Sequence, residues 1–168
     1  MKQSKYWHAA ATLAAVCAMT AAPGAMAAGE HKQTHEHASA APSRLGLDHG
    51  RKWATDEALR GGMARIRELV EPQLAGAHDG KLSAAQYGAL AGQVETEVAG
   101  IVANCKLEPK ADAMLHLVIG DIGAGTDAMA GKTPKRKPQQ GLAQVAAAVN
   151  NYGRYFEHPG FKPIQLGH

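Results

Sequence analysis

Apolar residues recur at intervals of three and four along four separate segments of this chain, between Trp53 and Phe156. Such intervals place apolar side chains on one face of an α-helix, whereas a half-buried β-strand needs strict alternation, which is not found here. Each such helix must bury its apolar face against a neighbour. The four predicted apolar faces are Leu59, Met63, Ile66, Val70 and Leu74; Tyr87, Leu90, Val94, Val98, Ile101 and Cys105; Ala111, Leu115, Val118 and Ile122; and Leu142, Val145, Val149, Tyr152 and Phe156. The sequence therefore predicts an all-α protein.

Residues that start or stop helices separate the four segments. Thr55 and Ser83 are predicted N-caps, because a hydroxyl oxygen can accept a hydrogen bond from a free N–H group of the first helical turn. Pro109 suits the first turn of the third helix, where its missing N–H group costs little. Because the connections are short, we predict an antiparallel, up-down-up-down four-helix bundle over residues 51–158. Residues 159–168 are predicted to form an irregular C-terminal tail.

Helix-breaking residues also lie inside two of the predicted helices. Pro72 falls in the last turns of the first helix and is expected to bend it. Gly120, Gly123 and Gly125 occupy the centre of the third helix. Each glycine costs around 1 kcal/mol of helix propensity relative to alanine. The third helix is therefore predicted to be either the weakest helix or the most closely packed one.

The first 27 residues have the form of a secretory signal peptide. Lys2 and Lys5 precede a short run of small apolar residues, and Ala25 and Ala27 match the preference of signal peptidase for small residues. The apolar run is shorter than the about 20 residues of a permanent transmembrane helix, and no second run of that length follows. The sequence predicts a periplasmic protein from which residues 1–27 are removed.

Removal of the signal peptide changes what the composition implies. It takes away two lysines and no acidic residue, which leaves 16 basic against 15 acidic side chains. This balance argues against a nucleic-acid partner. Residues 28–168 are enough for one domain. Cys105 is the only cysteine left, so a disulfide in the oxidising periplasm would have to join two chains as a homodimer.

Residues 28–50 contain almost no large apolar side chains and are predicted to be a disordered tail. The stretch GEHKQTHEHA within this tail contains His31, His35 and His37. His49 adds a fourth imidazole at the end of the tail. Imidazole is a good ligand for copper, nickel and zinc ions, and histidine-rich tracts are typical of metal binding. The tail is therefore predicted to bind a transition-metal ion that exchanges readily, because ordering the tail offsets part of the coordination energy.

Two other interpretations of the tail remain open. If trimming left Gly29 as the first residue, its amine, two amide nitrogens and the His31 imidazole would form a square-planar site suited to Cu(II) or Ni(II). Cleavage after Ala27 places His31 fourth in the chain and prevents that arrangement. In the remaining interpretation the tail is a hydrophilic spacer whose histidines bind nothing.

Two short stretches resemble parts of known periplasmic proteins. LRGGMARIRELV is similar to the first helix of the soluble b-type cytochromes, with Met63 at the position of the axial methionine. NNYGRYF resembles their last helix, although Gly153 stands where their axial histidine belongs. The chain thus resembles the haem-carrying four-helix bundles, which include the b-type cytochromes and cytochrome c-prime. The absence of a C-x-x-C-H motif excludes covalent, c-type haem attachment.

Haem bound without the family histidine would need a substitute ligand. His158 lies five residues after Gly153, more than one helical turn away. The resemblance therefore implies a haem-free relative of these cytochromes. The stretch LDHGRKWATDEALRGGM is also similar to the DnrO-like exported proteins, a resemblance that implies no firm activity.

Catalysis has little support in the sequence. Cys105 and His116 are separated by a helix junction and could meet as a nucleophile and base, but no third residue accompanies them. His116 is instead expected to be a hydrogen-bonded structural histidine. We therefore expect a non-enzymatic protein that binds copper, nickel or zinc through its tail, in metal buffering, sensing or stress response. The alternatives are a b-type haem protein for electron transfer that uses Met63, and an interaction module independent of metal.

Overall fold

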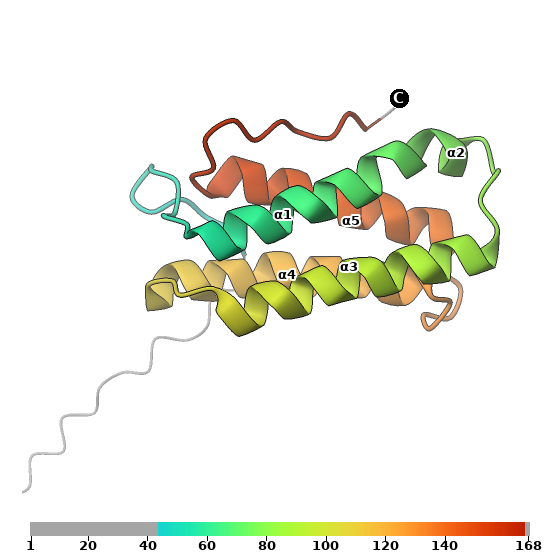
Figure 1. The fold of residues 1–168 in the computed structure, drawn as a ribbon, viewed down its shortest axis with the longest axis horizontal. Helices are drawn as coiled ribbons and strands as arrows, with labels where there is room; N and C mark the ends of the chain where they lie inside the picture. Colours follow the sequence, from blue (N-terminus) through green and yellow to red (C-terminus); the bar gives the residue numbers. More distant parts are fainter. Residues whose placement is uncertain (1–43, 167–168) are drawn as a thin grey trace, which may run out of the picture. The chain divides into compact units, whose positions relative to one another are not determined.

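The computed structural model describes residues 44–166, which fold into helices joined by short connections (Figure 1). The predicted all-α class is confirmed for this part of the chain, which contains two isolated β-bridges and no strand. The helices are α1 (Glu57–Val70), η1 (Glu71–Gln73), α2 (Leu74–His78), α3 (Ala84–Asn104), α4 (Pro109–Met129) and α5 (Pro138–Tyr155). None of these helices has the length and apolar character of a membrane span. The predicted signal peptide and His31, His35 and His37 lie outside the described residues.

The start of α1 differs from the prediction by one residue. Asp56, not Thr55, is the N-cap, and its Oδ1 atom accepts a hydrogen bond of 2.8 Å from the backbone N–H of Leu59. The hydroxyl of Thr55 instead donates to the carbonyl oxygen of Glu157, at 2.5 Å. The second carboxylate oxygen of Asp56 accepts from the backbone N–H of Lys106, also at 2.5 Å. Asp56 therefore ties the start of α1 to the connection between α3 and α4.

The other predicted boundary residues act as expected. Ser83 caps α3, and its hydroxyl and the side chain of Gln86 form a reciprocal capping box. Pro109 lies in the first turn of α4. Pro72 falls within η1, where the α-helical hydrogen bonding of the first segment changes to a 3-10 turn before α2.

The four long helices enclose an apolar core. Helix α1 packs against α3 and α5, and α4 packs against the same two helices. The core residues come from all of the predicted apolar faces. They include Leu59, Met63, Ile66, Val70, Leu90, Val94, Ile101, Leu115, Val118, Ile122, Leu142, Val145, Val149, Tyr152 and Phe156.

The three glycines of α4 have different surroundings. A Cβ atom at Gly125 would lie 2.6 Å from the Val145 side chain and 2.9 Å from the carbonyl oxygen of Gly141. A Cβ atom at Gly120 or Gly123 would meet no atom within 4 Å. The predicted close packing of this helix is therefore confirmed at Gly125, where α4 approaches the backbone of α5.

The irregular C-terminal segment, residues 157–166, is tied to α1 and α5. The side-chain amide of Asn150 donates to the carbonyl oxygen of Ile164 at 2.9 Å and accepts from its N–H at 2.7 Å. The guanidinium of Arg67 donates to the carbonyl oxygen of Lys162 at 2.7 Å. Ile164 is buried. This segment is therefore part of the folded domain although it forms no helix.

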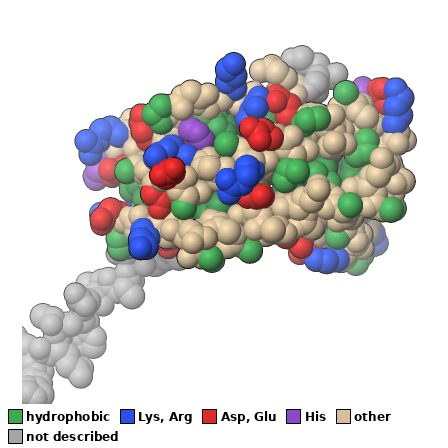
Figure 2. All heavy atoms as spheres, viewed as in Figure 1, with side chains coloured by type: hydrophobic (Ala, Val, Ile, Leu, Met, Phe, Trp, Pro, Cys, Tyr) green, Lys and Arg blue, Asp and Glu red, His purple; other side chains and the backbone are tan. Residues whose placement is uncertain are grey.

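Charged side chains of both signs are mixed over the face shown in Figure 2, and apolar side chains gather toward the α2 end. Arg65 Nε lies 2.6 Å from the Glu97 carboxylate, and Lys132 Nζ lies 3.1 Å from that of Asp127. Exposed pairs of this kind stabilise a fold only slightly.

Candidate functional site

His49 lies at the tip of a tight turn ahead of α1. The N–H of Asp48 donates to the carbonyl oxygen of Arg51 at 2.8 Å, and the N–H of Arg51 donates back at 2.9 Å. His49 and Gly50, between them, have positive φ angles of 49° and 85°. Positive φ at both central positions is the pattern of a type I′ turn, and histidine adopts it more readily than most residues with a Cβ atom.

The indole of Trp53 fixes this turn to the helical domain. Its Nε1 atom donates to the carbonyl oxygen of Gly46 at 2.6 Å, and its backbone N–H donates to the carbonyl oxygen of Tyr155 at 2.9 Å. Leu45 is half-buried against the core. Folded structure thus begins within residues 28–50, the segment that the sequence assigned to the disordered tail.

The His49 imidazole is accessible to a ligand. Its side chain is 88% exposed, and its Nε2 atom lies 3.8 Å from Oδ1 of Asp48, beyond hydrogen-bonding distance. An imidazole nitrogen and a carboxylate oxygen are both ligands for divalent transition metals. Within residues 44–166, no group of three or more His, Cys, Asp or Glu residues is placed to hold an ion. The predicted four-histidine site includes three residues outside this range.

Met63 and Gly153, the two positions of the cytochrome resemblance, are both closely packed. Met63 has no exposed surface and belongs to the apolar core, as its predicted place on the core face implied. A Cβ atom at Gly153 would lie 2.5 Å from the ring of Phe161. A haem ligated by Met63 would require the packed core to open, and a side chain at position 153 would require Phe161 to move.

Cys105 and His116 lie in different surroundings, since Cys105 is half-buried and His116 is exposed. Burial, followed by the carboxylates of Asp56 and Asp112, raises the pKa of the Cys105 thiol. A raised pKa lowers the fraction of the reactive thiolate. His116 is exposed, and its Nδ1 atom lies 2.9 Å from the carbonyl oxygen of Asp112. The expected hydrogen bond of His116 is thus confirmed, on the surface of α4.

His158 pairs with a buried phenol that the helical pattern placed in the core. The Tyr152 side chain has no exposed surface, and its hydroxyl lies 2.9 Å from Nδ1 of His158. Burial raises the pKa of Tyr152 above its ordinary value, so the phenol stays protonated. Burial, and then the charge of Arg60, lower the pKa of His158. No pattern in the sequence indicates this pair, beyond the apolar position of Tyr152.

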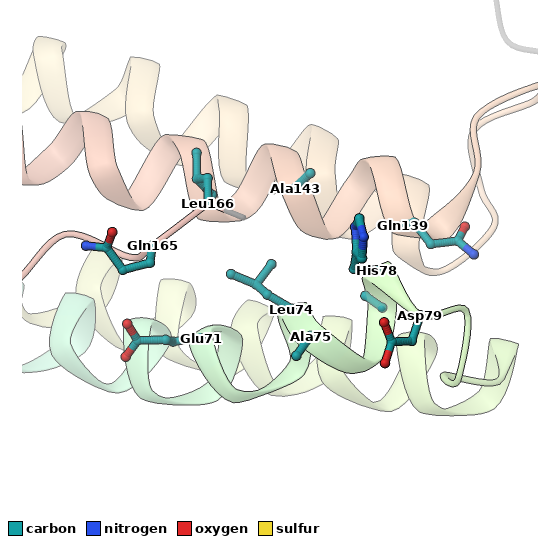
Figure 3. A pocket seen from close by; sticks show the side chains of 10 residues that line it. Glu71, Leu74, Ala75, His78, Asp79, Gln139, Ala143, Gln165 and Leu166 are labelled. Carbon is teal, nitrogen blue, oxygen red and sulfur yellow. The ribbon is translucent and has the colours of Figure 1, made fainter. Parts of the chain in front are cut away.

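A groove of about 580 Å³ lies between α2 and α5 (Figure 3). Leu74 reaches into the gap between these helices, and Leu166 of the C-terminal segment lies on the α5 side. His78 stands beside Gln139 at the far end. Asp79 also lines the groove, but its carboxylate is paired with Lys81 at 2.7 Å. The groove combines an apolar floor with a polar rim, a form typical of binding surfaces.

Comparison with known proteins found no match for this chain among protein families, curated proteins or solved structures. The resemblance to the periplasmic cytochromes and to the DnrO-like proteins rests on the quoted stretches alone.

Proposed function

We propose that this chain is a periplasmic, non-enzymatic protein that binds copper, nickel or zinc ions through His31, His35, His37 and His49. It would act in metal buffering, sensing or stress response. The observation that carries this proposal is the clustering of three histidines within GEHKQTHEHA, just after a signal-peptide pattern. Neutral imidazole is the ligand that these ions favour among the side chains of the tail.

The surroundings of His49 support this proposal from the folded side. Its exposed imidazole lies at the point where the chain enters the helical domain, with the Asp48 carboxylate beside it. The hydrogen-bonded turn between Asp48 and Arg51 keeps both groups at the surface. A ligand that is already positioned loses less conformational freedom when an ion binds than one on a flexible chain.

We also infer that the four long helices form an antiparallel, up-down-up-down bundle that carries the histidine-rich tail. The inference is supported by the short connections and by the order in which the helices pack, with α1 between α3 and α5. In this arrangement the bundle supplies a stable anchor, and the metal chemistry belongs to the tail.

Metal titration of the exported full-length protein tests this function. Purified protein is stripped of metal and titrated with Cu(II), Ni(II) and Zn(II) under native mass spectrometry, which also reports the true N-terminus. We expect stoichiometric uptake of at least one of these ions by the wild type. The triple substitution of His31, His35 and His37 by alanine should abolish this uptake, and His49→Ala should weaken it.

A matched control removes histidines from the helical domain. The double variant His78→Ala and His116→Ala changes two exposed histidines on α2 and α4 and should take up metal as the wild type does. Uptake that survives in the triple variant would contradict the proposal, as would a wild type that binds these ions only as weak adducts. In the second case the tail would be a spacer.

A further inference from the structure

A pocket of about 440 Å³ opens where the chain leaves α5 and passes the start of α1. It is lined by Ala54, Thr55, Arg60, Glu157, His158 and Pro159. Three of these residues carry groups that can bind a charged ligand. Neither the helical pattern nor the histidine cluster pointed to this place.

The pairing with Tyr152 sets the proton position on His158. The phenol O–H is buried, and His158 Nδ1 is its hydrogen-bond partner within residues 44–166. Donation from the phenol to an unprotonated Nδ1 satisfies both groups, whereas the reverse arrangement leaves the buried O–H without an acceptor, so the first arrangement is favoured. In a neutral imidazole the proton then lies on Nε2. His158, which lines the pocket, then has an N–H donor on its other ring nitrogen.

Arg60 supplies a fixed positive charge in the same pocket. Its Nη1 atom donates to the carbonyl oxygen of Thr55 at 2.8 Å and to the Thr55 hydroxyl at 3.0 Å. Among residues 44–166 its Nε and Nη2 atoms make no protein hydrogen bond, and Arg60 forms no ion pair there. A guanidinium edge held in this way matches the two oxygens of a carboxylate.

Glu157 gives the pocket a negative charge as well. Glu157 is an exposed residue that lines the pocket, and its backbone is fixed by hydrogen bonds to Trp53 and Thr55. A ligand with only a carboxylate would meet repulsion from Glu157, and one with only an ammonium group would meet repulsion from Arg60. A zwitterion with both groups satisfies all three side chains.

We propose that this pocket binds a small amino acid, whose carboxylate is held by Arg60 and His158 and whose ammonium group is held by Glu157. The apolar surfaces of Ala54 and Pro159 would contact a small side chain. This site is separate from the proposed metal site, since none of its ligands is a residue of the histidine cluster.

An NMR titration of the metal-free, full-length protein tests the proposal, with glycine as the probe. Acetate, which carries only the carboxylate, and methylammonium, which carries only the ammonium group, are titrated for comparison. Removal of metal is essential because glycine itself chelates Cu(II). We expect saturable binding of glycine, at least about tenfold tighter than that of acetate or methylammonium, since each lost charge contact costs that much or more. Shifts should centre on Arg60, His158 and Glu157.

Two substitutions separate the charges. Arg60→Gln should weaken glycine binding at least about tenfold. Glu157→Gln alters an exposed side chain, so the fold should survive; glycine binding should weaken and acetate binding should not. The matched controls are Arg65→Gln and Glu108→Gln, which leave the pocket intact. Absence of saturable glycine binding would overturn the proposal, and so would glycine binding that Glu157→Gln leaves unchanged.

Discussion

The two ends of α5 differ in what surrounds them. Near its start, Gly141 packs against Gly125 of α4 so closely that neither position has room for a Cβ atom. We call this contact the seam. Past its end, the junction (residues 45–56 and 155–161) holds polar groups, the exposed His49 and two pockets. The seam leaves no space for a ligand, whereas the junction does. We infer that the seam determines the fold and that the junction, with the tail before it, provides binding.

The largest expected effect is at the seam. In Gly141→Ala the new Cβ atom would lie 2.5 Å from the carbonyl oxygen of Gly125 and 2.7 Å from the backbone nitrogen of Met129. Backbone atoms cannot move aside as a flexible side chain can, so the variant should lose about 3 kcal/mol of the free energy of unfolding. Chemical denaturation measures this loss. Unchanged stability would contradict the close approach of α4 and α5 at this position. Metal uptake by the folded variant should stay at the wild-type level, because the seam is not part of the proposed metal site.

A smaller loss is expected at the junction. Asp56→Ala removes the acceptor for the N–H groups of Leu59 and Lys106. Loss of an N-cap costs about 1 to 2 kcal/mol of the free energy of unfolding. Because the hydrogen bond from Lys106 is lost as well, the loss should lie at the upper end of this range. Asp56→Asn keeps an acceptor oxygen and should recover most of the stability in the same denaturation experiment. Equal losses in the two variants would show that charge, not capping, is what Asp56 supplies.

The outlines of the fold were predictable, because local patterns carry them. Periodic apolar positions located the core faces, and the Ser83 capping box and Pro109 marked helix starts. The seam was not predictable in detail: Gly120 and Gly125 are the same residue type on one helix, and only the packed structure shows which of them contacts α5.

The junction was the least predictable region. The composition of residues 28–50 predicts disorder, yet Leu45 and the Trp53 indole fix the last part of this segment to the domain. The Tyr152 and His158 pair joins a helical position to an irregular segment, so no regular spacing reveals it. The candidate metal ligands were read from composition, and only His49 lies among the described residues.

A pH dependence should distinguish the junction from the seam. The pKa of His158 in the folded protein lies below the ordinary value of about 6.5. At a pH between these two pKa values the unfolded chain therefore binds more protons than the folded protein does. The stabilisation is therefore complete above about pH 6.5 and is lost as the pH falls below it. His158→Gln should reduce this acid-dependent loss, measured by denaturation across pH, and the control His116→Gln should retain it. Equal acid sensitivity in both variants would contradict a lowered pKa of His158 in the folded protein.

The smallest effect is expected on the open side of α4. A Cβ atom at Gly120 meets no other atom within 4 Å, so Gly120→Ala should gain up to about 1 kcal/mol from helix propensity alone. Gly120→Ala should raise the free energy of unfolding and Gly141→Ala should lower it. Measured in one denaturation series, these opposite changes would sharpen the contrast between an open and a closely packed position. Destabilisation by Gly120→Ala would indicate that this surface is covered in solution.

The central claim is that the tail and His49 bind metal after export. The most direct measurement is the metal content, by elemental analysis, of wild-type protein purified from a periplasm without chelator, beside the His31, His35 and His37 triple alanine variant. The account predicts copper, nickel or zinc in stoichiometric amount in the wild type and its loss in the triple variant. A metal-free wild type, or metal retained by the triple variant, would contradict it.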